Sequence, residues 1–221
     1  MGLADRDDAE LRGYYAARAL EYDRVYLKPE RQPDLRLIEA WLPQALAGRT
    51  VLELACGTGY WSVLIREHCA RLVSLDANEE TLAIARARPR GESIEWLQGD
   101  AYQLPHLGRE FNGAFAGFWW SHVPLDRQQS FLQGWHAALV PGAVVVLLDN
   151  RFVAGSSTPI SERDAQGNTY QHRALANGST HRVLKNFPTE RQLRMALEPW
   201  ADEVEVVEWV HYWAVRYRLR A

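Results

Sequence analysis

Residues 51–62, VLELACGTGYWS, constrain the fold of this chain more than any other stretch of its sequence. An apolar run rich in Val and Leu ends at the tetrapeptide CGTG, and a second apolar stretch begins directly after it. A buried strand that ends in a glycine turn and opens a helix lets the backbone approach a ligand closely, and the helix offers unpaired N–H groups there. The stretch therefore predicts an α/β protein that binds a nucleotide-like ligand at this turn.

The chain that follows alternates between strand and helix patterns. We predict strands at residues 50–55, 71–75, 93–97, 111–118 and 143–148, and helices at residues 60–69, 79–88 and 125–139. Strands that alternate with helices at this spacing form a parallel sheet with right-handed crossovers. Two later runs, 204–210 and 212–219, follow each other so closely that they predict an antiparallel pair at the sheet edge.

Two further segments predict additions to this sheet. Apolar residues at helical spacing in 9–26 and 34–46 indicate a helical cap, and 168–173 and 180–185 flank Asn177-Gly178, which favours a hairpin turn. Thr189 is a suitable cap for a helix at 189–197. The predicted organisation is a single domain with a helical cap (1–48), a core (49–150), a lid and hairpin insert (151–188), and a terminal helix with antiparallel strands (189–221).

The composition of the chain limits the classes of partner that it could bind. The formal net charge of −3 argues against a protein held mainly to nucleic acid phosphates, and the two cysteines cannot build a disulfide framework or a thiolate metal cluster. The longest strongly apolar stretch, 143–148, is too short to cross a bilayer. The start, MGLADRDD, has no signal-peptide pattern. We therefore expect a cytoplasmic monomer or homodimer with no membrane or nucleic acid partner.

Three acidic residues accompany the glycine turn in chain order. Glu53 lies inside the first strand, where a carboxyl group needs a cationic ligand or a backbone donor as a partner. Asp76 ends the second strand, where its side chain can accept both hydroxyls of a ribose. Asp100 follows the third strand, where it can accept a hydrogen bond from an adenine amino group.

This succession resembles the class I S-adenosylmethionine-dependent methyltransferases of the small-molecule type. The resemblance rests on ELACGTG (53–59), LDAN (75–78), QGDAYQLP (98–105) and LVPG (139–142), and it covers residues 50–150. It implies a Rossmann-like, seven-stranded, mostly parallel sheet with an antiparallel last strand, an N-terminal helical lid and a β-hairpin insert after the fifth strand. It also implies S-adenosylmethionine as cofactor and S-adenosylhomocysteine as product. The residues expected to bind the cofactor are Tyr14, Glu53, Ala55, Gly57, Gly59, Asp76, Ala77, Asp100, Ala101 and Phe118.

Other interpretations of the same residues remain open. The glycines could serve only a tight turn, Asp76 could cap the following helix, and Asn78 is a better candidate for that cap. A nicotinamide oxidoreductase shares the glycine turn and the acidic strand end. Ser62, however, stands where the third Gly or Ala of that fingerprint belongs, and no Tyr has a Lys four residues later.

The methyl acceptor should lie beyond the carboxyl ends of the fourth and fifth strands, at GFWWSHVP (117–124). This stretch lacks the D/N-P-P-Y/F turn of the amino and amide methyltransferases and the nucleophilic Cys of the cytosine type. Asp149-Asn150 matches part of the pattern of metal-dependent catechol enzymes, but the Asp expected at the fourth-strand end is missing. We therefore predict that no metal is used.

His122 is the candidate general base, because an unperturbed His titrates near neutrality, although a loop His that only packs is an equal alternative. Trp119 and Trp120 are expected to flank the cofactor or acceptor, with core packing as the alternative. Polar and basic residues of the insert indicate an anionic acceptor, unless they are merely the solvated face of a hairpin. The residues expected to bind the acceptor are Tyr15, Arg18, Trp119, Trp120, Arg151 and Arg173.

We therefore predict an enzyme that transfers a methyl group to an O, N or S atom of a small metabolite by direct in-line displacement. Two alternatives remain. The acceptor could be RNA or a protein side chain, or the chain could bind the cofactor without transferring its methyl group.

Overall fold

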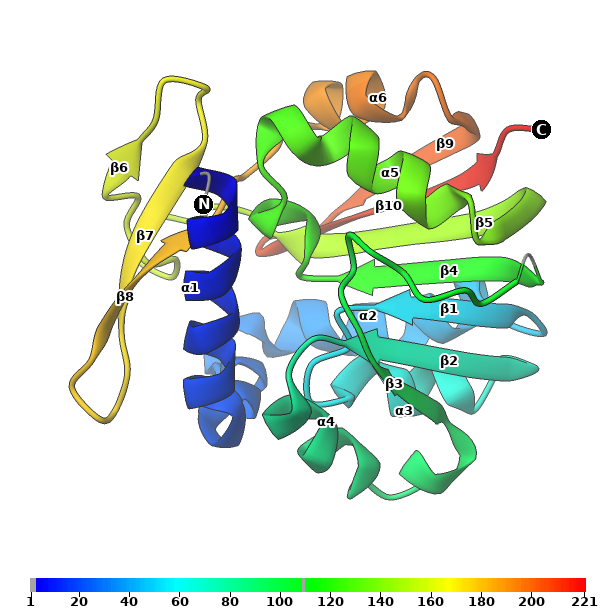
Figure 1. Ribbon diagram of the computed structural model, residues 1–221, viewed down its shortest axis with the longest axis horizontal. Coiled ribbons are helices and arrows are strands. Elements are labelled where there is room, and N and C mark those ends of the chain that lie inside the picture. Colours follow the sequence, from blue (N-terminus) through cyan, green and yellow to red (C-terminus); the bar gives the residue numbers. More distant parts are fainter. Residues whose placement is uncertain (1–2, 109) are drawn as a thin grey trace.

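The strands of the main sheet confirm the predicted alternation. The computed structural model describes residues 3–108 and 110–221. The sheet contains β1 (Thr50–Leu54), β2 (Arg71–Asp76), β3 (Glu95–Gln98), β4 (Phe111–Gly117), β5 (Leu139–Asn150), β9 (Ala201–Glu208) and β10 (Tyr212–Leu219). Their order is β3-β2-β1-β4-β5-β10-β9, and β10 runs antiparallel to both of its neighbours (Figure 1). The predicted seven-stranded sheet with an antiparallel last strand is thus confirmed.

Helices cover both faces of this sheet (Figure 1). They are α1 (Leu3–Arg18), α2 (Gln32–Ala45), α3 (Tyr60–Arg66), α4 (Glu79–Arg86), α5 (Gln128–His136) and α6 (Glu190–Leu197), with short 3-10 helices η1 (Ala19–Leu27), η2 (Pro29–Arg31), η3 (Gly91–Ser93), η4 (Trp120–His122) and η5 (Leu125–Arg127). Apolar residues of α2 and α3 form one core layer with the sheet, and those of α5 and α6 form the other. Burying both faces explains why β1 and β5 are almost continuously apolar.

The insert after β5 is a small separate sheet. Its strands β6 (Glu162–Arg163), β7 (Thr169–Ala174) and β8 (Thr180–Leu184) are antiparallel, so the predicted hairpin is present with one additional strand. Helix α1 stands between this small sheet and the carboxyl ends of the parallel strands (Figure 1). A hydrogen bond of 2.9 Å from the Arg182 backbone N–H to Glu10 Oε1 joins α1 to β8.

Several element boundaries differ from the prediction. Strand β5 begins at Leu139 rather than at residue 143 and so contains Pro141. Proline is tolerated there because the register between β4 and β5 shifts between Phe111 and Gly113, which leaves Pro141 outside the regular ladder. The helix predicted at 125–139 is a 3-10 turn followed by α5, and the predicted cap of α6 by Thr189 is confirmed as a full capping box with Gln192.

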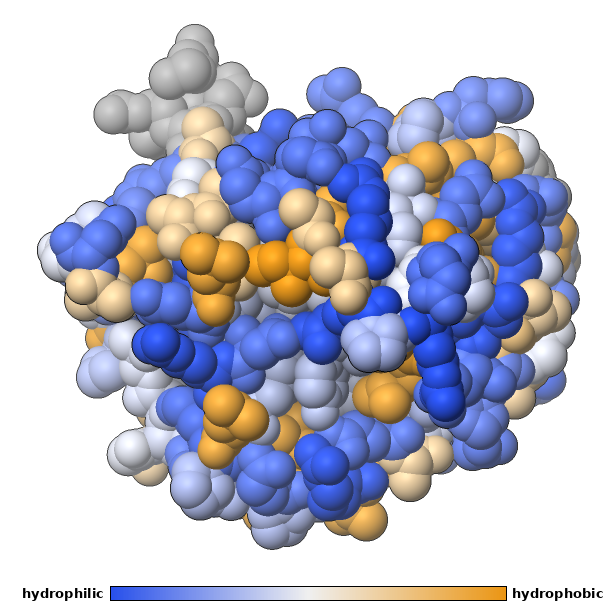
Figure 2. Space-filling model, turned by 90° about the horizontal axis from the view of Figure 1, so that it is seen from below, coloured by the Kyte–Doolittle hydropathy of each residue, from blue (hydrophilic) through white to orange (hydrophobic). Residues whose placement is uncertain are grey.

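The described helices include none that is both long and apolar enough to cross a membrane. On the face seen in Figure 2, hydrophilic residues predominate and the apolar ones lie in separate groups between them.

One carboxyl group is buried within the sheet. Glu53, in the middle of β1, is 2% exposed, and its Oε2 accepts a hydrogen bond of 2.6 Å from the Ser74 hydroxyl on β2. The expected cationic or backbone partner is therefore a neutral hydroxyl. Burial raises the pKa of Glu53 from 4.5 to about 7, because the interior penalises the charged form.

Glu53 should make the stability of the ligand-free protein depend on pH. Between its unfolded and folded pKa values the native state binds more protons than the unfolded state, so stability falls as pH rises through this window. Glu53→Gln keeps the shape and the neutral charge, so we expect it to remove a loss of roughly 2 to 3 kcal/mol between pH 5 and pH 8. Urea unfolding of both proteins at each pH measures this, and identical pH dependence would contradict the assignment.

Candidate active site

The glycine turn after β1 and the ends of β2 to β4 surround one cavity. This first cavity lies at the carboxyl edge of the sheet, where the strand order reverses between β1 and β4. Most of the residues predicted to bind the cofactor line it: Ala55, Gly57, Asp76, Ala77, Asp100, Ala101 and Phe118. The structure thus brings together four segments that are distant in the sequence.

Asp76 is the best-anchored acid in this wall. Its Oδ1 accepts hydrogen bonds of 2.9 Å from the Asn78 N–H and the Thr81 hydroxyl, and its Oδ2 accepts one of 2.8 Å from the Gly57 N–H. A carboxylate has about four lone-pair positions, so one on Oδ2 remains for a further donor. The carboxylate is held rigidly and retains room for one hydroxyl rather than for two.

Asp100 connects the cavity to helix α1. Its Oδ2 lies 2.5 Å from the Arg12 guanidinium, and its Oδ1 accepts a hydrogen bond of 2.8 Å from the Tyr102 N–H. Asn78 is the N-cap residue of α4, as one of the alternatives expected, but its side chain makes no cap hydrogen bond; its amide donates to the Arg12 carbonyl at 3.3 Å. Helix α1 is therefore fastened to the loops after β2 and β3, as expected for a lid.

Three predicted cofactor residues lie outside the wall of the first cavity. Glu53 is buried beneath it, and Tyr14 lines a neighbouring cavity instead. Gly59 packs against α4 and β3, since a Cβ built on it would stand 2.9 Å from both Ala85 Cβ and the Trp96 ring. With a φ of +75°, this glycine serves the tight turn into α3.

A second cavity lies beside the first, between the N-terminal helices and the insert. Tyr15, Tyr22 and Phe118 line both cavities, so these three side chains mark where the two meet. Arg18 and Arg173, both predicted to bind the acceptor, line the second cavity. The backbone of Phe118 has a φ of +59°, a conformation that is strained for a residue with a side chain and that is often retained at ligand sites.

His122 lies beside this junction with both ring nitrogens engaged. Its Nδ1 is 2.6 Å from the Leu184 carbonyl, which can only accept, so Nδ1 carries the proton. Its Nε2, 2.8 Å from the Tyr15 hydroxyl, therefore accepts the phenol proton. Burial, together with the nearby charges of Lys185 and Arg173, holds the pKa of His122 well below its usual value. His122 is thus a neutral imidazole that orients Tyr15.

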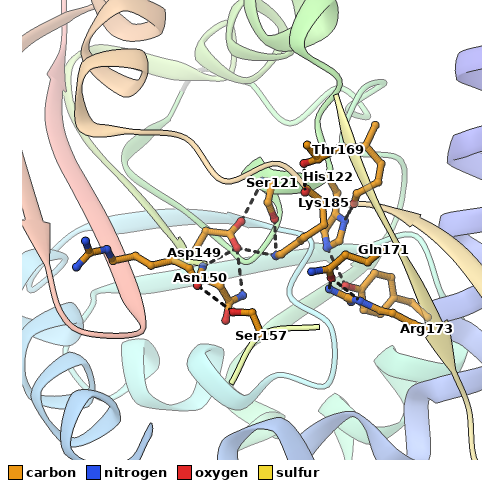
Figure 3. Close-up of polar contacts among 12 residues, drawn as sticks. Ser121, His122, Asp149, Asn150, Ser157, Thr169, Gln171, Arg173 and Lys185 are labelled. Carbon is orange, nitrogen blue, oxygen red and sulfur yellow. Dashed lines mark hydrogen bonds and ion pairs between the residues drawn. The ribbon is translucent and has the colours of Figure 1, made fainter. Parts of the chain in front are cut away.

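A buried ion pair that sequence analysis did not single out lies next to His122 (Figure 3). Lys185 Nζ lies 2.7 Å from Asp149 Oδ1 and 2.5 Å from the Ser121 hydroxyl, and Asp149 Oδ2 accepts the Ser121 N–H at 3.0 Å. Burial lowers the pKa of Lys185 to about 8. Burial alone would raise the pKa of Asp149, but the charge of Lys185 holds it below its usual value. The sequence signal that could have revealed this pair is Asp149, an acid next to the end of a strongly apolar strand.

The other three residues predicted to bind the acceptor, Trp119, Trp120 and Arg151, do not lie together. Trp119 lines the first cavity, whereas Trp120 is 1% exposed and packs against Phe131, so core packing is its role here. Arg151 lines neither cavity, because its guanidinium bonds the Trp209 carbonyl at 2.6 Å and lies 3.5 Å from Glu208. Across the part of the chain that the structure describes, no group of three or more metal-ligating side chains is assembled.

Comparison with known proteins agrees with the motifs. A family profile described as "Methyltransferase domain" matches residues 51–142. The chain is 39% identical over 112 residues to 2-phytyl-1,4-naphtoquinone methyltransferase of Thermosynechococcus vestitus, covering 49% of this chain and 48% of that protein. It is 26% identical over 166 residues to demethylmenaquinone methyltransferase of Clavibacter sepedonicus, covering 75% and 64%. The chain thus spans about half the length of most curated relatives that it matches.

Solved structures match over nearly the whole chain. The structure described as "DhpI-SAM-HEP complex" has a TM-score of 0.79 and 27% identity, covering 96% of this chain and 97% of that one. The structure described as "DhpI-SAH complex structure" has a TM-score of 0.77 and 26% identity, covering 96% of both chains. The matching profile, these neighbours and the cavity built from the glycine turn agree: residues 51–142 carry the sequence pattern of a methyltransferase domain, and the chain has the fold of structures described as complexes with SAM and SAH.

Proposed function

We propose that this protein transfers the methyl group of S-adenosylmethionine to a small molecule, with the cofactor in the first cavity and the acceptor in the second. The observation that carries this proposal is the meeting of the two cavities at Tyr15, Tyr22 and Phe118. Methyl transfer needs two substrates held in line at a place shielded from water, and adjoining cavities of this kind supply that arrangement. The DhpI structures, described as complexes with SAM and SAH, support the choice of cofactor.

The residues of the first cavity suit the parts of this cofactor. Asp76 accepts a ribose hydroxyl, Asp100 and Ala101 receive the adenine, and the backbone at Ala55 and Gly57 approaches the methionine portion. When bound, S-adenosylmethionine supplies a methyl group activated by the positive sulfur. The chain's own task is then to align the acceptor and keep out water, and α1 contributes by covering the junction through Tyr15.

His122 has two roles to choose between. As a base it would receive a proton from the acceptor, either directly or through the Tyr15 hydroxyl. The lowered pKa of His122 and the cations around it disfavour protonation of its ring. We therefore favour a positioning role, in which His122 accepts a hydrogen bond from the Tyr15 hydroxyl and holds it at the junction.

The acceptor is proposed to be small because α1 and the insert flank the second cavity. Methyl-labelled cofactor added with a cell extract separated by size tests this, and we expect label in the small-molecule fraction. Label only in RNA or protein would overturn the small acceptor. Tight cofactor binding without transfer to any fraction would instead indicate a binding module. The cytoplasmic location and the monomeric or homodimeric state remain predictions.

Asp76→Ala should weaken binding of S-adenosylhomocysteine by about 10- to 100-fold, because a ribose hydroxyl loses a charged acceptor. Isothermal titration calorimetry measures this, with Asp126→Ala, an exposed acid of η5, as the control that should bind normally. Since Asp76 also holds the Gly57 turn, thermal melting must confirm that the variant is folded. If the unmodified protein does not bind S-adenosylhomocysteine at micromolar concentrations, the proposed function is wrong.

His122→Ala should leave cofactor affinity unchanged and slow turnover about tenfold, because the Tyr15 hydroxyl loses the acceptor that orients it. A positioning role predicts that the pH dependence of turnover keeps its shape. A loss beyond about 100-fold together with a flattened pH profile would show instead that His122 is the general base.

A further inference from the structure

The second cavity carries a marked excess of positive charge. Six Lys or Arg residues and only one acid, Glu21, are among the residues that line it. Two of the six already have a carboxylate partner: Lys185 pairs with Asp149 at 2.7 Å, and Arg24 lies 3.8 Å from Glu21. Within the described residues, no carboxylate lies within ion-pair distance of the other four, which are Arg18, Lys28, Arg31 and Arg173.

Arg31 is the most deeply buried of these four cations. It is 7% exposed, and its guanidinium donates only to neutral oxygens, at 2.8 Å to Asn150 Oδ1 and at 3.2 and 3.3 Å to the Ser156 hydroxyl. The Lys28 ammonium donates to the Ser156 carbonyl at 3.1 Å. Burial and the charge of Arg31 lower the pKa of Lys28, although the nearby exposed carboxylate of Glu30 acts in the opposite direction.

Arg173 occupies a second position in the cavity wall, nearer the junction. Its guanidinium donates twice to Gln171 Oε1, at 2.7 and 3.1 Å, and lies 5.8 Å from the centre of the Tyr14 ring. Arg18 donates to the Tyr14 hydroxyl at 2.9 Å. The partners of both arginines are again neutral, so the two positions share one property: positive charge held in place by groups that do not neutralise it.

Holding unneutralised cations in a partly buried wall costs stability unless an anion joins them. The single carboxylate of the cofactor can account for at most one of the four. The remainder are left for the other substrate. Resting on the proposed function, we propose that the methyl acceptor is an acid, a small molecule bearing a carboxylate or phosphate group, which Arg31 and Arg173 bind in the second cavity.

The weak basicity of His122, whose Nε2 already accepts the Tyr15 hydroxyl proton, agrees with an acid acceptor. If an anionic oxygen is the nucleophile, it attacks the methyl carbon directly, the carbon–sulfur bond breaks, and its electron pair returns to sulfur. The positive charge of the sulfonium and the negative charge of the oxygen cancel, and no proton has to be removed. A site without an effective base is therefore sufficient for this acceptor.

The test is to titrate inorganic phosphate and, separately, succinate into the protein saturated with S-adenosylhomocysteine, at constant ionic strength set with chloride. Calorimetry should show that at least one of the two acids binds. Arg31→Gln and Arg173→Gln should each weaken this binding about tenfold or more, because each removes a charged donor, while affinity for S-adenosylhomocysteine stays within twofold. The acid that binds tells a phosphate acceptor from a carboxylate acceptor.

Arg151→Gln is the matched control, because Arg151 is a partly buried arginine of the same region that lines neither cavity. Its acid binding should equal that of the unmodified protein. Since Arg31 also holds Asn150 and Ser156, Arg31→Lys is measured beside Arg31→Gln and should retain part of the binding.

Two results would overturn the proposal: neither acid binds although S-adenosylhomocysteine does, or binding survives unchanged in both glutamine variants. Loss of S-adenosylhomocysteine binding itself would count against the proposed function rather than against the acid acceptor. As an independent check, an extract separated by anion exchange should yield the methyl-accepting compound in the retained fraction. Its recovery only in the unretained fraction would contradict an acid.

Discussion

The buried pair of Lys185 and Asp149 is the interaction on which the arrangement of the site depends. Their side chains are 4% and 0% exposed, and either charge alone would be costly in this interior. Asp149 lies near the end of β5 and Lys185 directly follows β8, so satisfying both charges requires the small sheet to dock against the large one. The Leu184 carbonyl then accepts a hydrogen bond from His122 Nδ1, and the Asn186 N–H donates to the Ser121 carbonyl at 2.8 Å. The small sheet in turn provides the surface on which α1 packs.

The polar groups of the two cavities are neutralised in different ways. In the first cavity, acids are satisfied by hydrogen-bond donors of the protein, as Asp76 is by Gly57 and Thr81. In the second, four cations have no acid of the described chain within ion-pair distance, and they are oriented by neutral oxygens. The acids of the first cavity therefore have most of their partners without a ligand, whereas the cations of the second cavity lack a charged partner until an anion binds.

Much of the fold and the cofactor cavity was predictable because the signals are local. The strand, glycine turn and helix around Gly57 lie between residues 50 and 66. Asp76 ends β2 and Asp100 lies two residues after β3, so parallel pairing brings them to one edge. The acceptor side was not predictable in the same way. Lys28 lies between two 3-10 turns and Arg31 ends the second of them, with no periodic pattern, and only long-range folding brings these residues to Asn150 and Ser156. Trp119 and Trp120 are adjacent in the sequence, and only the conformation of a short turn makes one line the first cavity and the other pack in the core.

Helix α1 has a consequence for the way the molecule is assembled. It is held by partners far along the chain, for example by the contact of Glu10 with Arg182, which are 172 positions apart. Contacts of such separation form late, because they must wait until the distant partner exists and is folded. During synthesis α1 emerges well before β8, so its packing against the small sheet cannot be completed until β8 has been made. The parallel strands can therefore pair while the walls that α1 gives to the two cavities are still incomplete.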